Sequence, residues 1–140
     1  MDLRRYAGAF VEACDWSTER PAPEVWSPLE YACHVRDVLQ IQIGRVARGL
    51  AEDTPSFEPM QRDERPARLR YAEQDPHVVR EELLDAAHAL ADVYDHLTEA
   101  HLERTVTYNH PSRMVRSLRW VGQHTVHELV HHAMDVQRGR

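Results

Sequence analysis

The sequence predicts an all-α fold, a four-helix bundle with a long crossover between the second and the third helix. Three observations lead to this prediction. Apolar residues recur at intervals of three and four over four segments, as they do on one face of a helix. A stretch rich in proline, arginine and glutamate separates the second segment from the third. Alternation of apolar and polar residues, which would indicate a strand, is weak and limited to TVTY (Thr105 to Tyr108).

The first helix is expected over about residues 2–15. Its apolar side chains fall on one face at helical spacing, and they belong to Leu3, Tyr6, Phe10, Val11 and Cys14. The segment ERPAPEV (Glu19 to Val25) is then expected to be a linker, because its prolines interrupt a helix.

The second helix has a clear start in the segment WSPLE. Ser27 can cap the helix, Pro28 suits its first position, and Glu30 completes a capping box. The helix is expected to run to about Ala51. Residues 52–75 follow, and a connection of that length in a small domain usually has a function or crosses the bundle. Within it, the basic segment of residues 62–70 is expected to be a solvated loop.

The third helix is expected to begin at Pro76 and to turn toward the core a stripe formed by Val79, Leu83, Ala86, Leu90, Val93 and Leu97. After residues 103–111, Ser112 opens the last helix, which is expected to continue to about Gln137. Its core stripe consists of Val115, Leu118, Gly122, Thr125, Val126, Leu129, Ala133 and Val136.

At 140 residues the chain is most economically one domain, residues 1–140. Its formal net charge is −6, whereas a surface that follows phosphates needs an excess of basic residues, so nucleic acid is not an expected partner. No segment has the apolar length of a signal peptide or a membrane span. Two cysteines, Cys14 and Cys33, do not make a disulfide framework. We therefore expect a cytoplasmic protein that acts on a small molecule.

The segment HELVH (His127 to His131) fits H-E-x-x-H, the pattern that supplies two zinc ligands and a general base in metalloproteases. On a helical wheel, however, both histidines lie roughly 150–170° from the core stripe. Gln137 stands where a metzincin would place its third histidine. Glu128 and His132 lie only roughly 70–110° from the stripe, at the edge of the buried face. They are the better candidates for an interior metal site.

A third ligand is needed, because two protein ligands hold zinc poorly. His34 lies on an otherwise apolar face of the second helix, so its imidazole requires a partner. That partner is either a metal ion shared with Glu128 and His132, or a backbone carbonyl or the hydroxyl of Tyr108.

The segments WSPLEYACH (Trp26 to His34) and ELVHHAMD (Glu128 to Asp135) together resemble the second-helix and last-helix signatures of the DinB-like superfamily. The order of the helices and the crossover are similar as well, so the resemblance covers nearly the whole chain. It implies that His34, Glu128 and His132 bind a metal ion. Asp135, one turn after His132, would contact a ligand side chain and not the ion itself. The superfamily includes mycothiol-dependent maleylpyruvate isomerases, whose last-helix pair is also Glu and His, and bacillithiol-related transferases.

The resemblance implies a metal-dependent enzyme with thiol S-transferase or isomerase chemistry of the mycothiol type, using a low-molecular-weight thiol as cosubstrate. A metal-dependent hydrolase is one alternative, since water can take the place of the thiol at an open coordination position. A non-catalytic stress-response module that binds a metal or a small ligand is another. The ligand set suits zinc or nickel, and also iron or manganese. Arg45, Arg62 and Arg70 are candidates to bind an anionic thiol.

Cys33 is expected to pack in the core and not to act as a ligand or nucleophile beside His34, because adjacent residues of a helix do not share a face. Arg70 or Tyr71 is expected to line the mouth of the site. The second helix also carries a surplus apolar stripe nearly opposite His34, which indicates helix packing in a homodimer. The stripe consists of Ala32, Val35, Leu39, Ile43, Val46 and Leu50.

Overall fold

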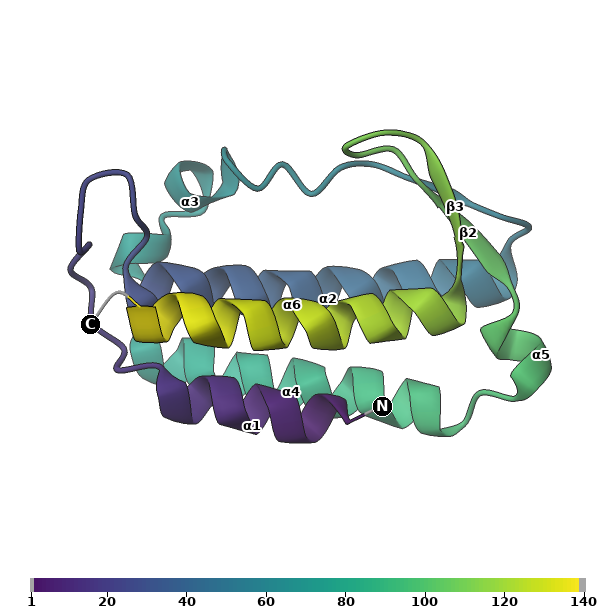
Figure 1. The fold of residues 1–140 in the computed structure, drawn as a ribbon, viewed down its shortest axis with the longest axis horizontal. Helices are drawn as coiled ribbons and strands as arrows, with labels where there is room; N and C mark the ends of the chain where they lie inside the picture. Colours follow the sequence, from purple (N-terminus) through teal and green to yellow (C-terminus); the bar gives the residue numbers. More distant parts are fainter. Residues whose placement is uncertain (1, 139–140) are drawn as a thin grey trace.

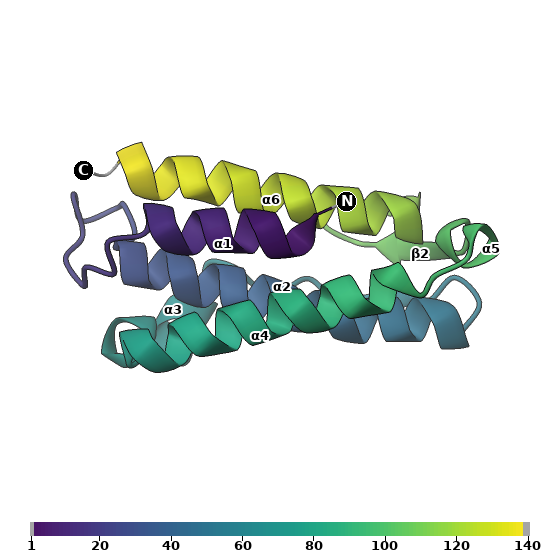
Figure 2. The same ribbon diagram turned by 90° about the horizontal axis from the view of Figure 1, so that it is seen from below.

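The computed structural model describes residues 2–138 and confirms the four-helix bundle (Figure 1). Its long helices are α1 (Leu3–Ala13), α2 (Pro28–Ala51), α4 (Pro76–Asp95) and α6 (Leu118–Arg138). Both α1 and α2 pack against α4 and α6, so that α1 lies diagonally across the bundle from α2. Figures 1 and 2 show that α2 and α4 run in one direction and α1 and α6 in the other. Because α2 and α4 are parallel, the chain between them has to cross back along the bundle.

The start of α2 is fixed by the predicted capping box. The Ser27 hydroxyl accepts a hydrogen bond from the backbone N–H of Glu30 (3.1 Å), and the Glu30 carboxylate accepts one from the N–H of Ser27 (3.1 Å). Two hydrogen bonds from Arg20 (2.8 and 2.7 Å) hold the same carboxylate, and they lower the pKa of Glu30. The linker is thereby tied to the helix start, and His34 is placed one turn further along α2.

The crossover between α2 and α4 is more structured than the sequence indicates. It contains β1 (Ser56–Phe57), the short helix α3 (Arg65–Arg68) and the 3-10 turn η1 (Tyr71–Glu73), and it runs back above α2 in Figure 1. The basic segment of residues 62–70 is mostly exposed, as predicted, but α3 lies within it and Arg65 is partly buried. The crossover is therefore held against the bundle.

The prediction that the last helix begins at Ser112 is wrong. The segment TVTY forms β2 (Thr105–Tyr108), which pairs with β3 (Met114–Ser117) as an antiparallel hairpin and with β1 in parallel, and α6 begins only after β3. Val115, assigned to the core stripe, lies opposite Thr107 in the hairpin and is 48% exposed. The strands form because β-branched residues favour extended backbone and because the pairing satisfies the amides and carbonyls of both segments.

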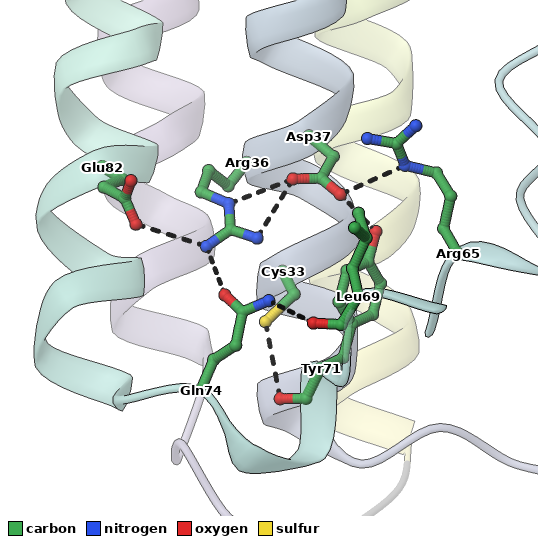
Figure 3. Close-up of polar contacts among 8 residues, drawn as sticks. All are labelled: Cys33, Arg36, Asp37, Arg65, Leu69, Tyr71, Gln74 and Glu82. Carbon is green, nitrogen blue, oxygen red and sulfur yellow. Dashed lines mark hydrogen bonds and ion pairs between the residues drawn. The ribbon is translucent and has the colours of Figure 1, made fainter. Parts of the chain in front are cut away.

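A buried polar network holds the crossover against α2 (Figure 3). The carboxylate of Asp37 is buried and accepts a hydrogen bond from the hydroxyl of Tyr71. Arg36 and Arg65 lie on either side of it, with their Nε atoms 3.1 and 3.3 Å from its oxygens. Arg36 also reaches Glu82 of α4 (3.3 Å). Buried charges are tolerated only when they are paired and hydrogen-bonded, so this network joins α2, α3, η1 and α4 at one point.

The apolar stripe of α2 is covered within the single chain, so it gives no support to a homodimer. α4 and α6 pack on α2 from two sides, and the hairpin end of the bundle adds further cover. Four members of the stripe are buried, namely Ala32, Val35, Leu39 and Val46. The other two, Ile43 and Leu50, are partly buried and pack against the core. No helix in the described part of the chain is long and apolar enough to cross a membrane.

Gly49 marks a close approach between α2 and the hairpin end of the bundle. A Cβ atom at this position would lie 2.8 Å from Leu118 Cδ2 and 2.9 Å from Val106 Cγ1, whereas one at Gly44 would have nothing within 4 Å. We expect Gly49→Ala to lower the free energy of unfolding by about 1–3 kcal/mol, the usual cost of overpacking. Gly44→Ala, on the same helix, should raise it by about 0.5–1 kcal/mol. Urea unfolding measures both, and a stabilised Gly49→Ala would refute the close packing.

Candidate metal centre

The three predicted ligand residues meet where α2 packs against α6. One ligand atom from each of His34, Glu128 and His132 lies within 4.8 Å of the other two. His34 comes from the second turn of α2, and the other two residues lie one turn apart on α6. His34 is 4% exposed, His132 is 2% exposed, and the side chain of Glu128 is 31% exposed. Antiparallel packing of the two helices thus brings together residues from distant parts of the sequence.

Both ring nitrogens of His132 face carboxylates. Nε2 lies 3.1 Å from Glu128 Oε2, and Nδ1 lies 3.0 Å from Asp135 Oδ2. A neutral imidazole carries one proton and can donate it to only one of them. With that proton on Nδ1, toward Asp135, the lone pair of Nε2 faces the Glu128 carboxylate, and a cation between the two would stabilise the arrangement. Metal-binding histidines commonly donate their second nitrogen to a carboxylate in this way.

The ring of His34 makes no hydrogen bond to another described residue. Its centroid lies 5.2 Å from that of Trp26 and 4.8 Å from that of His132. Burial, with a smaller effect of His132, lowers the pKa of His34 to about 3, so the ring is neutral at pH 7. Neither non-metal partner considered from the sequence is found, since the hydroxyl of Tyr108 contacts Gln42 instead (3.3 Å).

The charge state of the cluster suits a divalent cation. The hydrogen bond with His132 lowers the pKa of Glu128 to about 2, although burial acts in the opposite direction. Glu128 is therefore ionised at pH 7 while His34 is neutral. These are the forms in which carboxylate and imidazole side chains bind metal ions.

The two histidines of the H-E-x-x-H pattern lie outside this cluster. His127 and His131 are exposed on α6. His131 lies 3.5 Å from Asp135, in a second group of potential ligand atoms that shares His132. The helical wheel therefore separates the pair His127 and His131 from the pair Glu128 and His132, as predicted. The first pair is exposed, whereas His132 is buried.

A pocket of about 260 Å³ opens onto the cluster between α2, the crossover, β2 and α6. His34 and Glu128 line it, so that a small molecule can reach them from solvent. Arg45 and Arg62, two of the three arginines proposed from the sequence, also line the pocket.

The expectation that Arg70 or Tyr71 lines the mouth of the site is wrong. Arg70 is exposed and forms an ion pair with Glu73, away from the pocket. Tyr71 is fully buried, because its hydroxyl binds the carboxylate of Asp37. A buried carboxylate requires hydrogen-bond donors, and the end of the crossover supplies the Tyr71 hydroxyl as one of them.

Three polar residues of the pocket, Gln42, His110 and His124, were not identified from the sequence, and Tyr108 was considered only as a partner of His34. His124 lies one turn before Glu128, at the same spacing that separates Glu128 from His132, so this spacing could have indicated it. Its ring stacks on Trp120 with centroids 4.5 Å apart, and burial lowers its pKa. Gln42 and Tyr108 meet only because the hairpin folds onto α2, and no local pattern encodes that contact.

Cys33 is a core residue, as predicted. It is fully buried, and its thiol donates a long hydrogen bond to the carbonyl of Tyr71 (3.8 Å; Figure 3). Burial raises the pKa of Cys33 to about 12. A thiol with this pKa is protonated at neutral pH and is a poor nucleophile.

We expect Ellman's reagent to modify Cys33 in the native protein no faster than the protein unfolds globally. The urea-unfolded chain should react at once, because its thiols are solvated. Stopped-flow absorbance with the wild type and Cys14→Ser isolates the signal of Cys33. Fast modification of Cys33 in native buffer would show that the thiol is accessible and would rule out a purely structural role.

Comparisons with known proteins agree with this fold. Among solved structures, YfiT from Bacillus subtilis is similar, with a TM-score of 0.85 and 15% sequence identity over 98% of this chain and 81% of that chain. YfiT is described as a probable metal-dependent hydrolase with an unusual four-helix bundle topology. No curated protein matches the sequence. The sequence model of the DinB superfamily matches residues 4–135, and the protein therefore belongs to the DinB superfamily.

Proposed function

We propose that the protein binds one divalent metal ion through His34, Glu128 and His132, with Asp135 orienting His132. The observation that carries the proposal is the buried ring of His132 between two carboxylates, next to the imidazole of His34, which has no hydrogen-bond partner among residues 2–138. The separation of 3.1 Å between His132 Nε2 and Glu128 Oε2 fits as well. Two ligands about 2.1 Å from one ion and about 90–110° apart are separated by roughly 3.0–3.4 Å. The set suits zinc or nickel, and also iron or manganese.

Three protein ligands leave the ion open on the pocket side. An ion held there lowers the pKa of a bound water or thiol and so supplies a nucleophile near neutral pH. His124 is neutral at pH 7, because burial lowers its pKa, and it can accept a proton at the wall of the pocket. The chain therefore combines a metal site, a substrate pocket and a neutral imidazole.

Two reactions fit this arrangement. Hydrolysis is supported by the volume of the pocket, which at about 260 Å³ is small for a substrate and a bulky thiol together. The likeness to YfiT, a probable metal-dependent hydrolase, agrees with it. Thiol S-transferase or isomerase chemistry is supported by the pair Glu128 and His132, which resembles that of the mycothiol-dependent isomerases. Metal-dependent hydrolysis of a small molecule is the better supported of the two, because the likeness to YfiT and the small pocket both agree with it.

Metal content tests the site itself. Protein purified without chelators should contain about one divalent ion per chain. His34→Ala, Glu128→Ala and His132→Ala should each abolish stoichiometric binding, because only two ligands remain. Asp135→Asn should weaken the affinity roughly 10–100-fold, since it removes the carboxylate that orients His132. Elemental analysis and calorimetric titration with zinc measure these changes.

The matched control is the double variant His127→Ala/His131→Ala, which removes two exposed histidines and should keep its metal. Glu128→Gln distinguishes the two registers of the motif further. In an H-E-x-x-H site the Glu is a base and not a ligand, so Glu128→Gln would leave metal binding unchanged. If Glu128 is a ligand, as proposed, Glu128→Gln should weaken metal binding. A double variant that loses its ion, together with a Glu128→Gln variant that keeps it, would overturn the assignment.

Cobalt(II)-loaded protein distinguishes the two reactions, because a thiolate bound to cobalt gives an intense charge-transfer absorption. We compare a mycothiol-type thiol with N-acetylcysteine, which lacks the sugar. For a hydrolase, both thiols should bind weakly and equally, because the reaction uses water and requires no binding site for the sugar. Absorption that saturates at a much lower concentration of the mycothiol-type thiol would instead assign thiol chemistry.

A further inference from the structure

The pocket beside the cluster carries positive charge in a protein whose formal net charge is −6. Among the described residues that line it, Glu128 is the one carboxylate, and it is a proposed metal ligand. Arg45 of α2 and Arg62 of the crossover line the same pocket, and neither forms an ion pair with a carboxylate of residues 2–138. A cleft with charge of one sign concentrates ligands of the opposite sign.

Arg45 is held in place with most of its donors unused. Its guanidinium lies over the rings of Phe57 and Tyr108, 5.3 and 5.2 Å from their centroids, and donates a hydrogen bond to the carbonyl of Glu58 (2.8 Å). Burial lowers the pKa of Arg45, because it removes water from the charged group. A guanidinium has five N–H donors, so a carboxylate can still bind to this one.

Arg36 is a buried arginine that, unlike Arg45, is paired with carboxylates. Its side chain is 8% exposed, and Asp37 and Glu82 both lie within 3.3 Å of it (Figure 3). Arg45 is half-buried and has no such carboxylate among the described residues. An unpaired charge removed from water is costly, and a carboxylate brought by a ligand would pair with it.

Gln42 offers a second unmet hydrogen-bonding group in the same pocket. It is 4% exposed, and its Nε2 donates to Tyr108 Oη (3.3 Å) and Thr125 Oγ1 (3.4 Å). Its Oε1 has no hydrogen-bond partner among the described residues. Buried polar atoms without partners are rare in folded proteins. Because the oxygen itself is buried, a donor of a bound molecule can reach it only after the Gln42 side chain turns toward the pocket.

We propose that the pocket binds the carboxylate of a small-molecule substrate at Arg45. Arg62 lies toward the metal end instead, with its guanidinium 4.9 Å from the ring centroid of Trp26, which is next to His34. The inference rests on the proposed function, because the metal site would hold the reacting end of the same molecule. Val38 and Ile41 line the pocket between the two ends, next to Gln42, so most of the middle of the substrate is apolar. His34 and Arg45 are about three turns apart on α2, roughly 16 Å along the axis. The substrate class is therefore a carboxylic acid whose reacting group is separated from the carboxylate by an apolar chain.

The test uses alkyl hydroxamates, whose hydroxamate group binds zinc and whose chain of two, four or six methylenes ends in a carboxylate. Each is compared with the neutral primary amide of the same length by calorimetric titration of the zinc-loaded protein. At the best length the acid should bind roughly tenfold to hundredfold more tightly than the amide, the range for a hydrogen bond to a charged group. Arg45→Gln should remove this preference and Arg45→Lys should retain part of it, whereas Arg62→Gln, at the metal end of the pocket, should keep most of it.

Arg48→Gln is the matched control, because Arg48 lies on the same helix and over Phe57 (5.2 Å) but does not line the pocket. This variant should keep the full preference. Zinc uptake and unfolding are measured first for every variant. Arg45→Lys, which keeps the charge but not the planar set of donors, serves should Arg45→Gln not fold. Equal affinity for acid and amide in zinc-loaded wild type, or a preference that stays undiminished in the Arg45 variants, overturns the carboxylate site and leaves the metal site standing. Failure of the wild type to take up zinc overturns the proposed function, and this inference with it.

Discussion

The packing of α2 against α6 is the constraint on which the rest of the structure depends. It buries the rings of His34 and His132 with their centroids 4.8 Å apart, out of reach of most of the solvent. Buried polar groups require partners, and the chain supplies Glu128 and Asp135 to His132 but no hydrogen-bonding partner to His34 among the described residues. A bundle core built for stability alone would fill these positions with apolar side chains. The polar cluster is better explained by a cation that all three proposed ligands share.

The crossover determines what can reach that cluster. β1 pairs with β2 at one end of the crossover, and the Asp37 network holds the other end against α2 and α4. The residues between these two anchors, Arg62 among them, form one wall of the pocket. A short connection after α2 would leave this face of the bundle open to water. The long crossover is therefore part of the site, since it converts a polar patch between two helices into a pocket.

The helices, the start of α2 and the register of the α6 motif could be predicted because apolar spacing and capping are local properties of the sequence. The hairpin could not, because MVRS has little strand pattern of its own and becomes extended through pairing with TVTY. Because the hairpin was not predicted, Tyr108 and Gln42, which it brings together, could not be recognised as pocket residues. Tyr71 was misplaced because the burial of its partner Asp37 depends on how the crossover folds back. The stripe on α2 suggested a dimer because a wheel shows which residues are apolar, not how many neighbours cover them.

A crystal structure of the protein loaded with zinc, with anomalous data collected at the zinc edge, tests the metal site most directly. We expect one anomalous peak about 2.0–2.2 Å from a ring nitrogen of His34, from Nε2 of His132 and from a carboxylate oxygen of Glu128. Asp135 should remain bound to Nδ1 of His132. A zinc ion held instead by His127 and His131, or a structure in which zinc is absent from the cluster and His34 binds a protein carbonyl, would contradict the assignment.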